Sequence, residues 1–397
     1  MNAGIKKGRD LARQGLFTEA ESVFRELARA HPNDPAPLWE LVYLAREQKS
    51  YPRMLEYLER ILHLAPDLLE ARILRRRLLA MRGEMAGLLG ELDTFFALSE
   101  KGPLTHAAAV QLFRAIQYCC TGSDRVLRLR TLLRLVRNTE ARETAKPLPF
   151  RVLSAEILLA LGDYAEFSEI VNELSRSQFR SRKIDQLRRI SEKCMAPDFP
   201  DFSAEKVFGI GLSRTGTSSL TDALSRLGYH AIHWFNPHSL TLISQSDFCL
   251  FDAFADIPAS CQFEFLYHSF PNARFVYTTR PIPSWETSIT HHYEMTHGIS
   301  SPAELRAPRL AHRFDFAAGR VESNLYSRFP TWSEAYRSFD FRVNHFFEDK
   351  PTSKLLKLGI CSGEGWEKLC PFLEKPIPPD AFPNSNPSPP GPGSPAS

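Results

Sequence analysis

Several features that would classify this 397-residue chain at once are missing from it. No stretch approaches the roughly 18 uninterrupted apolar residues that a membrane-spanning helix needs. The N-terminal segment MNAGIKKGRDLARQG also lacks the apolar core of a signal peptide. We therefore expect a cytoplasmic protein that is neither secreted nor inserted into a membrane.

Cysteine is scarce. The seven cysteines are odd in number, and neither Cys119–Cys120 nor the pair Cys361 and Cys370 has the spacing of a zinc site. We expect reduced, mostly buried thiols, as is typical of cytosolic proteins, and no bound metal.

The chain also has no clear excess of positive or negative charge. The 49 Lys and Arg residues nearly balance the 46 Asp and Glu residues, and the formal net charge is +3. Arginine clusters at 72–77 and 125–134 lack interleaved aromatic residues, so we interpret them as solvated helix faces. Neither nucleic acid nor an anionic membrane is expected as a partner.

The composition changes near residue 200, and the chain is long enough for two or three domains. Four of the five tryptophans and nine of the twelve histidines lie beyond this point. The first 195 residues are instead rich in Leu, Ala, Arg and Glu.

This first part carries a repeat with a period of 34 residues. One unit contains Gly15, Phe17, Ala20, Phe24, Ala28 and Pro32, and the next contains Tyr51, Met54, Leu58, Leu62 and Pro66. Small residues let two antiparallel helices approach, large ones fill the space between hairpins, and proline ends the second helix. Residues 1–195 therefore resemble a tetratricopeptide (TPR) array, an α-helical solenoid of about four or five hairpins.

TPR arrays usually present a concave surface to a protein partner. Two other roles stay open for this one: packing against the second part of the chain, and self-association.

A second type of fold begins after the polar hinge MAPDFPDFSAE. KVFGIGL is typical of a buried strand, SRTGTSS of a tight loop, and LTDALSRLG has helical spacing. A strand, loop and helix in this order form a phosphate cradle, because the loop N–H groups and the helix dipole both face the ligand. Gly216 permits close approach of a ligand, and the loop carries its own cation, Arg214.

Two common phosphate-binding motifs do not fit this loop. Gly211 and Gly216 have the spacing of a nucleoside triphosphatase loop, but Thr217 stands where its lysine belongs. Gly209 and Gly211 begin a dinucleotide-binding motif that lacks its third glycine. The missing lysine also argues against a nucleotide kinase.

GLSRTGTSSL resembles the loop (K/R)-(S/T)-G-T-(T/S) of sulfotransferases that use 3′-phosphoadenosine 5′-phosphosulfate (PAPS). In that family an Arg and a Ser eight residues apart hold the 3′-phosphate, and here the strand RFVYTT is followed by Arg280 and then, eight residues later, by Ser288. The resemblance implies that both residues bind the 3′-phosphate. It implies contacts with the 5′-phosphosulfate from Ser213, Arg214, Thr215, Gly216, Thr217 and Ser218.

The resemblance covers residues 205–386 and implies an α/β P-loop-like domain with a mostly parallel sheet. The strand KLLKLGI, a Trp366-bearing helix and a closing Phe-Pro-x-x-Asn are similar to the bacterial-type branch. Two features depart from the family: many relatives have Lys at the position of Arg214, and the Arg-Lys-Gly element of the cytosolic enzymes is not evident. The proline-rich tail 387–397 is expected to be disordered.

The resemblance also implies in-line sulfuryl transfer, with Arg214 stabilising the developing charge and a general base removing the acceptor's proton. Two residues compete for the role of base: Asp256 in FDAFADIP and His233 at the end of YHAIHW. We favour Asp256. The alternatives are a helix cap for Asp256 and an ordinary strand-end histidine for His233.

Three further residues have two interpretations each. His291 and His292 either line the acceptor channel or lie on the surface, which we favour. Trp285 either packs its helix against the sheet, which we favour, or stacks on adenine.

We therefore predict a PAPS-dependent sulfotransferase that modifies a hydroxyl or amine of an acceptor the sequence does not identify. The alternative is a TPR scaffold whose second domain binds the nucleotide without turnover.

Overall fold

The computed structural model describes residues 2–48, 50–81, 85–101, 104–120, 122–142, 148–177, 181–239, 243–306 and 325–385. The described residues pack as two compact units. Unit 1 contains the residues up to 142 together with 293–298, and unit 2 contains 148–292, 299–306 and 325–385.

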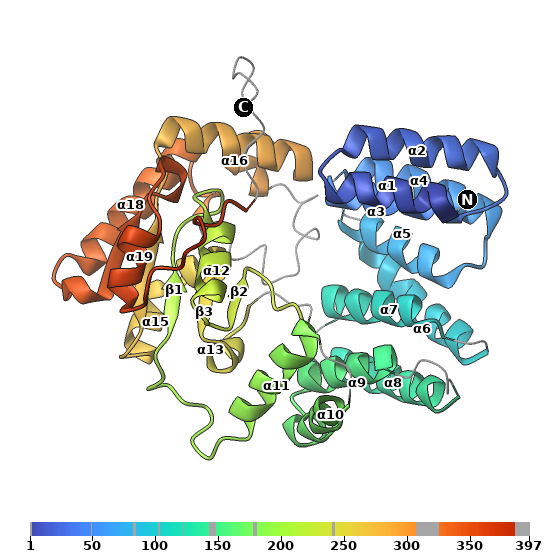
Figure 1. The fold of residues 1–397 in the computed structure, drawn as a ribbon, viewed down its shortest axis with the longest axis horizontal. Helices are drawn as coiled ribbons and strands as arrows, with labels where there is room; N and C mark the ends of the chain where they lie inside the picture. Colours follow the sequence, from blue (N-terminus) through green and yellow to red (C-terminus); the bar gives the residue numbers. More distant parts are fainter. Residues whose placement is uncertain are drawn as a thin grey trace. The chain divides into compact units, whose positions relative to one another are not determined.

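Unit 1 is a series of helices joined by short connections (Figure 1). They are α1 (Asn2–Arg13), α2 (Phe17–Ala30), α3 (Ala36–Glu47), α4 (Tyr51–Leu64), α5 (Leu69–Met81), α6 (Met85–Lys101), α7 (His106–Cys119) and α8 (Gly122–Arg142). Small residues permit close packing here: a Cβ on Gly8 of α1 would lie 2.4 Å from the ring of Phe24 on α2. The predicted helical first part is confirmed, while its assignment as a TPR array stays a prediction.

Unit 2 begins with three more helices, α9 (Leu148–Leu161), α10 (Tyr164–Arg176) and α11 (Arg182–Cys194). A buried hydrogen bond of 2.9 Å joins Ser191 of α11 to Ser168 of α10. Lys193, also on α11, forms an ion pair with Asp252, the residue that precedes a strand of the sheet. The predicted boundaries at 195 and 205 stay predictions, and the tail 387–397 lies outside the described residues.

The centre of unit 2 is a parallel five-stranded sheet, and the predicted fold class is confirmed. Its strands are β1 (Val207–Gly209), β2 (Ala231–His233), β3 (Ala253–Ala255), β4 (Arg274–Thr278) and β5 (Leu355–Leu358), in the order β2-β3-β1-β4-β5. Phe208 of central β1 lies in register with Phe254 and Phe275 of its neighbours, with ring centroids 5.4 and 5.5 Å apart. Buried on both faces, the strands are short apolar runs.

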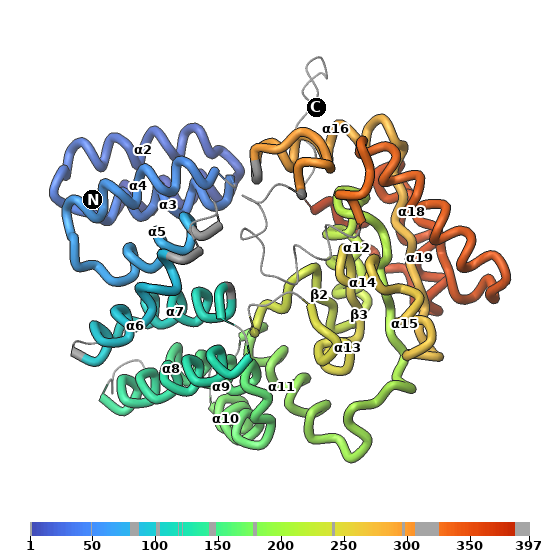
Figure 2. The backbone as a smooth tube through the Cα atoms, turned by 180° about the vertical axis from the view of Figure 1, so that it is seen from behind, coloured from blue at the N-terminus to red at the C-terminus, as the bar shows by residue number. Residues whose placement is uncertain are grey.

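Helices cover both faces of the sheet, because successive strand residues point to opposite sides. The helices of this part are α12 (Thr217–Arg226), α13 (Asp247–Leu250), α14 (Ile257–Cys261), α15 (Phe263–Ser269), α16 (Ile282–His297), α18 (Trp332–Phe347) and α19 (Trp366–Leu373), with short 3₁₀ turns at Pro302–Arg306, Thr352–Lys354 and Ile360–Ser362. Val276 packs with residues of α12 and α19, whereas Phe275 contacts aromatic rings of α15 and α18. Figure 2 shows the same elements from behind.

The end of the described chain is fastened to the α12–α19 face. Trp366 donates its indole N–H to the carbonyl of Asp380 at 2.8 Å and contacts the ring of Phe382, with centroids 4.7 Å apart. Ser385 N–H then donates to the hydroxyl of Ser219 on α12 at 3.0 Å. The closing Phe-Pro segment therefore packs beside the first helix of the sheet domain.

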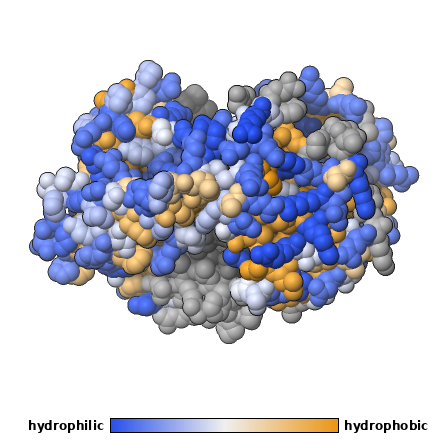
Figure 3. Space-filling model, turned by 90° about the horizontal axis from the view of Figure 1, so that it is seen from below, coloured by the Kyte–Doolittle hydropathy of each residue, from blue (hydrophilic) through white to orange (hydrophobic). Residues whose placement is uncertain are grey.

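Among the described residues, no helix combines the length and the apolar character needed to cross a membrane. The face in Figure 3 is covered mainly by hydrophilic side chains, with apolar ones in smaller groups between them.

Gly211, just after β1, provides a test of the packing between β1 and β4. A Cβ there would lie 1.8 Å from Thr278 Oγ1 and 2.7 Å from the Thr278 carbonyl, so backbone has to move. We expect Gly211→Ala to lower the free energy of unfolding by roughly 2 kcal/mol or more. The matched control is Gly90→Ala on α6, where the new Cβ meets nothing within 4 Å; it should change stability by less than about 1 kcal/mol, and upward. Equal effects of the two changes in thermal unfolding would contradict the predicted clash.

His230, at the start of β2, makes unit 2 sensitive to acid. Its side chain is buried with Nδ1 unpartnered, and burial lowers the pKa of His230 to about 3. Between this value and the ordinary pKa of about 6.5, the unfolded chain binds a proton that the folded chain does not, so stability rises with pH. At pH 5 the loss reaches about 2 kcal/mol relative to neutral pH.

We expect His230→Leu to reduce the difference in unfolding free energy between pH 7 and pH 5, measured by denaturant titration followed through tryptophan fluorescence. The control is His345→Leu, which replaces an exposed histidine of α18. It should keep the pH slope of the unmodified protein, and an unchanged slope in His230→Leu would rule out the buried imidazole as its cause.

Candidate active site

The loop between β1 and α12 has the form of a phosphate cradle. Ile210 N–H continues the pairing with β4 by donating to Val276 O at 2.9 Å, after which the chain turns. Arg214 and Gly216 both have positive φ, 71° and 98°. Gly216 caps α12 without a side-chain hydrogen bond, so the first N–H groups of this helix are left for a ligand.

The hydroxyl of Thr215 is used inside the protein. It is buried, donates to Leu212 O at 2.6 Å and lies 2.6 Å from the hydroxyl of Thr278 at the end of β4. Thr215 therefore fixes the loop to the sheet, and its predicted contact with the donor stays untested. Thr278 was not predicted as a site residue, although its place at the end of RFVYTT is a signal that could have found it.

Two arginines from separate parts of the chain meet over the loop. Arg214 Nε donates to Ser288 Oγ at 3.1 Å, and Arg280 Nη1 donates to the backbone carbonyl of Arg214 at 3.2 Å. Arg280 Nε also donates to Ser284 Oγ at 3.2 Å. Burial, and then the charge of Arg280, lower the pKa of Arg214.

Neither arginine has a carboxylate partner within ion-pair distance among the described residues. Asp256 acts on Arg214 from beyond ion-pair distance and only partly offsets burial and the charge of Arg280. Two like charges held this close repel each other, and an anion placed between them would relieve the repulsion. The structure thus brings the predicted Arg214, Arg280 and Ser288 together at one place suited to an anion.

The helix that carries Ser288 is held by Trp285 and Tyr336. Trp285 is fully buried, donates its indole N–H to Ser213 O at 2.9 Å and packs on the ring of Tyr336. This burial fits packing rather than stacking on adenine. The Tyr336 hydroxyl accepts the backbone N–H of Arg280 at 3.0 Å, a role for which the sequence holds no signal.

His233 and Asp256, considered as competing bases, lie in contact. Each stands at or just after the end of a parallel strand, and β2 pairs with β3 so that His233 is opposite Ala255. His233 Nε2 lies 3.0 Å from Asp256 Oδ2. The two candidates are therefore one pair.

The carboxylate of Asp256 is buried and meets four donors. Oδ1 accepts the Ser213 hydroxyl at 2.6 Å and the Ile257 N–H at 2.7 Å, and the latter bond caps α14. Oδ2 accepts the Thr217 hydroxyl at 3.0 Å and faces His233 Nε2. Burial acts to raise the pKa of Asp256, but the hydrogen bond and charge of His233 and the bonds from Ser213 and Ile257 outweigh it, so the pKa is lowered.

His233 is the more accessible member of the pair, with 31% of its side chain exposed against 8% for Asp256. Its Nε2 also lies 3.1 Å from Thr217 Oγ1 and 3.4 Å from Ser218 Oγ. Nδ1 has no hydrogen-bond partner among the described residues. One ring nitrogen is thus held by the loop and Asp256, and the other has no partner among the described residues.

The remaining histidine predictions concern α16. His291 is exposed and His292 is half-buried. No three His, Cys, Asp or Glu side chains converge as a metal site would require in the part of the chain that the structure describes.

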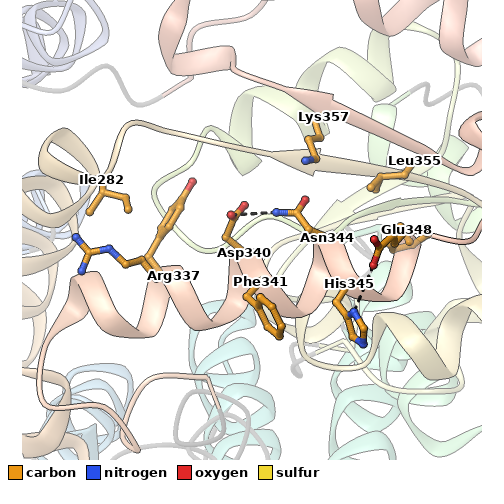
Figure 4. A pocket seen from close by; sticks show the side chains of 11 residues that line it. Ile282, Arg337, Asp340, Phe341, Asn344, His345, Glu348, Leu355 and Lys357 are labelled. Atoms are coloured by element: carbon orange, nitrogen blue, oxygen red, sulfur yellow. Dashed lines mark hydrogen bonds and ion pairs between the residues drawn. The ribbon is translucent and has the colours of Figure 1, made fainter.

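A groove of about 590 Å³ between α18 and β5 adjoins Arg280 and was not predicted (Figure 4). Tyr336 lines it and contacts the Arg280 backbone on its other side. Within it Asp340 accepts bonds from Asn344 and from the hydroxyl of Tyr277, both at 3.0 Å. Asp340 is thus bonded within the protein, and the second acid of the groove, Glu348, is ion-paired with His345.

Comparison with known proteins points to the kind of domain that carries this site. Residues 206–389 match the family model described as a sulfotransferase domain. A curated relative, "Ava biosynthesis cluster protein M" of Aspergillus versicolor, is 27% identical over 215 aligned residues, which cover 45% of this chain and 80% of the relative. The matched segment starts just before β1 and includes the loop, the two arginines and the His233–Asp256 pair. Residues 206–389 of this chain are therefore similar to sulfotransferase domains.

Proposed function

We propose that this domain binds PAPS and transfers its sulfuryl group to a hydroxyl or amine of an acceptor. The observation that carries the proposal is the pair Arg214 and Arg280, two cations without carboxylate partners beside the N-terminus of α12. PAPS carries an anionic 3′-phosphate and an anionic 5′-phosphosulfate on one ribose, so two neighbouring cations suit it. Ser288 and the α12 N–H groups add neutral donors at the same place.

We further propose that His233, rather than the favoured Asp256, is the general base. A carboxylate offers about four lone-pair sites, and Asp256 already meets four donors in a buried place. Its lowered pKa makes it a poor proton acceptor. If Nε2–H of His233 donates to Asp256, the unpartnered Nδ1 is the basic atom, and Asp256 is a positioning residue.

The acceptor oxygen or nitrogen forms a bond to sulfur while the bond from sulfur to the 5′-phosphate oxygen breaks, and the leaving nucleotide keeps that electron pair. His233 Nδ1 takes the acceptor's proton, and Asp256 stabilises the resulting imidazolium. Arg214 and the loop N–H groups offset the charge that develops on the leaving phosphate, since arginine acts here by charge and not as a proton donor.

For the whole chain we propose a cytoplasmic location, which accords with the composition. We also propose that the helices of unit 1 bind a protein partner or a second copy of the chain. The scaffold alternative shares the nucleotide site with the enzyme but lacks turnover.

Nucleotide binding can be tested with 3′,5′-ADP, which has both phosphates, and 5′-AMP, which lacks the 3′-phosphate. We expect the protein to prefer 3′,5′-ADP, and Arg280→Ala to weaken its binding by about tenfold or more, because a charge-assisted bond is lost. The preference over 5′-AMP should shrink with it. Isothermal titration measures both, and Arg188→Ala, which removes an exposed arginine of α11, is the control. No preference for 3′,5′-ADP in the unmodified protein would refute the assignment.

The base can be tested by separating binding from turnover. We expect His233→Ala to lower kcat about 10²–10⁴-fold, the usual contribution of a general base, while the affinity for 3′,5′-ADP changes little. Transfer from radiolabelled PAPS to a panel of phenols, alcohols and amines measures turnover. His291→Ala, an exposed histidine on α16, should behave like the unmodified protein. Nucleotide binding without labelled product from any acceptor in the panel would instead favour the scaffold.

A further inference from the structure

The strand that carries His233 has few contacts of its own within the sheet. β2 is three residues long, stands at the edge of the sheet and pairs with β3 as its one neighbouring strand. A short pairing on one side holds an edge strand weakly, because the other side of its backbone has no partner strand. Contacts from outside the sheet therefore have to fix the position of His233.

Helix α11 holds the beginning of β2. Lys193 of α11 forms an ion pair with Asp252, and the other oxygen of this carboxylate accepts the backbone N–H of His230 at 2.9 Å. Arg189, also on α11, donates to the backbone carbonyl of Gly228 at 3.4 Å. His230 directly precedes β2, so the chain is tied to α11 before it enters the strand.

Helix α9 holds the segment that leaves β2, residues 234–239. His238 of this segment is 1% exposed, and its Nδ1 lies 3.4 Å from Oε1 of Glu156 on α9. Glu156 is 5% exposed and also forms an ion pair of 2.7 Å with Lys183 of α11. Because a buried carboxylate needs donors around it, Glu156 favours the His238 tautomer with its hydrogen on Nδ1.

The second ring nitrogen of His238 is a cost to folding. Nε2 is buried and has no hydrogen-bond partner among the described residues, so it has lost its bond to water without replacement. A phenylalanine would avoid this cost and could still pack on Phe251, whose ring is parallel to that of His238 with centroids 6.4 Å apart. What only the histidine supplies is the polar contact with Glu156.

Backbone bonds connect this contact to the end of β2. Asn236 Oδ1 accepts the N–H of His238 at 2.9 Å, and Asn236 Nδ2 donates to Asp247 of α13 at 2.6 Å. Trp234 N–H donates to Ala255 O of β3 at 3.1 Å. Little freedom is left between His233 and His238, so a displacement of His238 is transmitted to the strand end.

We propose that Glu156 is a positioning residue for His233, and that α9 and α11 belong to the functional unit although the family match begins at residue 206. The inference rests on the proposed role of His233 as general base. Arg280 and Ser288 follow β4, which is separated from β2 by β3 and β1. Loss of the Glu156 contact therefore lowers turnover and leaves nucleotide binding nearly unchanged.

The test measures kcat with radiolabelled PAPS and the affinity for 3′,5′-ADP in variants of the full chain. We expect Glu156→Leu to lower kcat about tenfold or more, because a displacement of about 1 Å at a reacting group can cost about 10²-fold in rate. The affinity for 3′,5′-ADP should change little. Glu156→Gln keeps an oxygen that can accept from His238 and should retain most of the activity.

A second variant separates positioning from stability. His238→Phe removes the polar contact together with the unpartnered nitrogen, so it should fold about as stably as the unmodified protein and still lower kcat. Glu40→Leu is the matched control, since Glu40 of α3 is likewise a buried glutamate, is paired with Arg9 and lies in unit 1. It should destabilise the fold without changing kcat.

Hydrogen exchange tests the contact without turnover. The amides of residues 234–239 should exchange faster in Glu156→Leu and His238→Phe than in the unmodified protein or in Glu40→Leu, since a loosened segment opens more often.

Failure of this inference differs from failure of the proposed function. If 3′,5′-ADP does not bind, or if His233→Ala keeps the kcat of the unmodified protein, the proposed function fails. The positioning role of Glu156 is wrong if His233→Ala lowers kcat while Glu156→Leu and His238→Phe do not, or if the exchange of residues 234–239 is unchanged in both. It is also wrong if Glu156→Leu lowers kcat in the His233→Ala background as much as it does alone.

Discussion

The arrangement of the site depends on one buried carboxylate. Asp256 joins the phosphate loop, through Ser213 and Thr217, to the end of β2, through His233, and to the first N–H of α14. A buried charge is tolerated only where donors compensate it, so these four groups have to stay where they are. Because β1, β2 and β3 are parallel neighbours, their carboxyl ends meet at this single residue.

The positive charges of the site lack such compensation. Arg214 and Arg280 are fixed by serine hydroxyls and a backbone carbonyl, none of which neutralises a cation. The carboxylate of Asp256 is thus fully compensated by hydrogen-bond partners. The two arginines have no ion-paired carboxylate among the described residues and are left for a ligand. This contrast is the physical basis for interpreting Asp256 as a positioning group and the arginines as binding groups, and it links the fold to sulfuryl transfer.

Sequence reasoning found the elements of this site that are local. The loop after β1 and the Arg280–Ser288 spacing were visible because each lies within one strand–helix segment, although Ser288 bonds to Arg214 and not to Arg280. It treated His233 and Asp256 as rivals because their contact depends on the pairing of β2 with β3, which no local pattern shows. The positive φ of Trp234 depends on bonds to Ala255 and Ile243 and was equally hidden. The contact of α11 with the sheet region includes the Lys193–Asp252 ion pair, which joins segments far apart in sequence.

We propose that Asp256 acts through His233, and a double-mutant cycle on turnover distinguishes this role from an independent one. Substitutions of residues that work as one unit have non-additive effects on activity. The kcat values of His233→Ala, Asp256→Asn and the double variant are therefore compared, and the affinity of each variant for 3′,5′-ADP is measured as well. If Asp256 acts through His233, adding Asp256→Asn to His233→Ala causes little further loss of kcat. If instead Asp256→Asn lowers kcat as much in the His233→Ala background as it does alone, Asp256 acts independently and is not a positioning residue for His233.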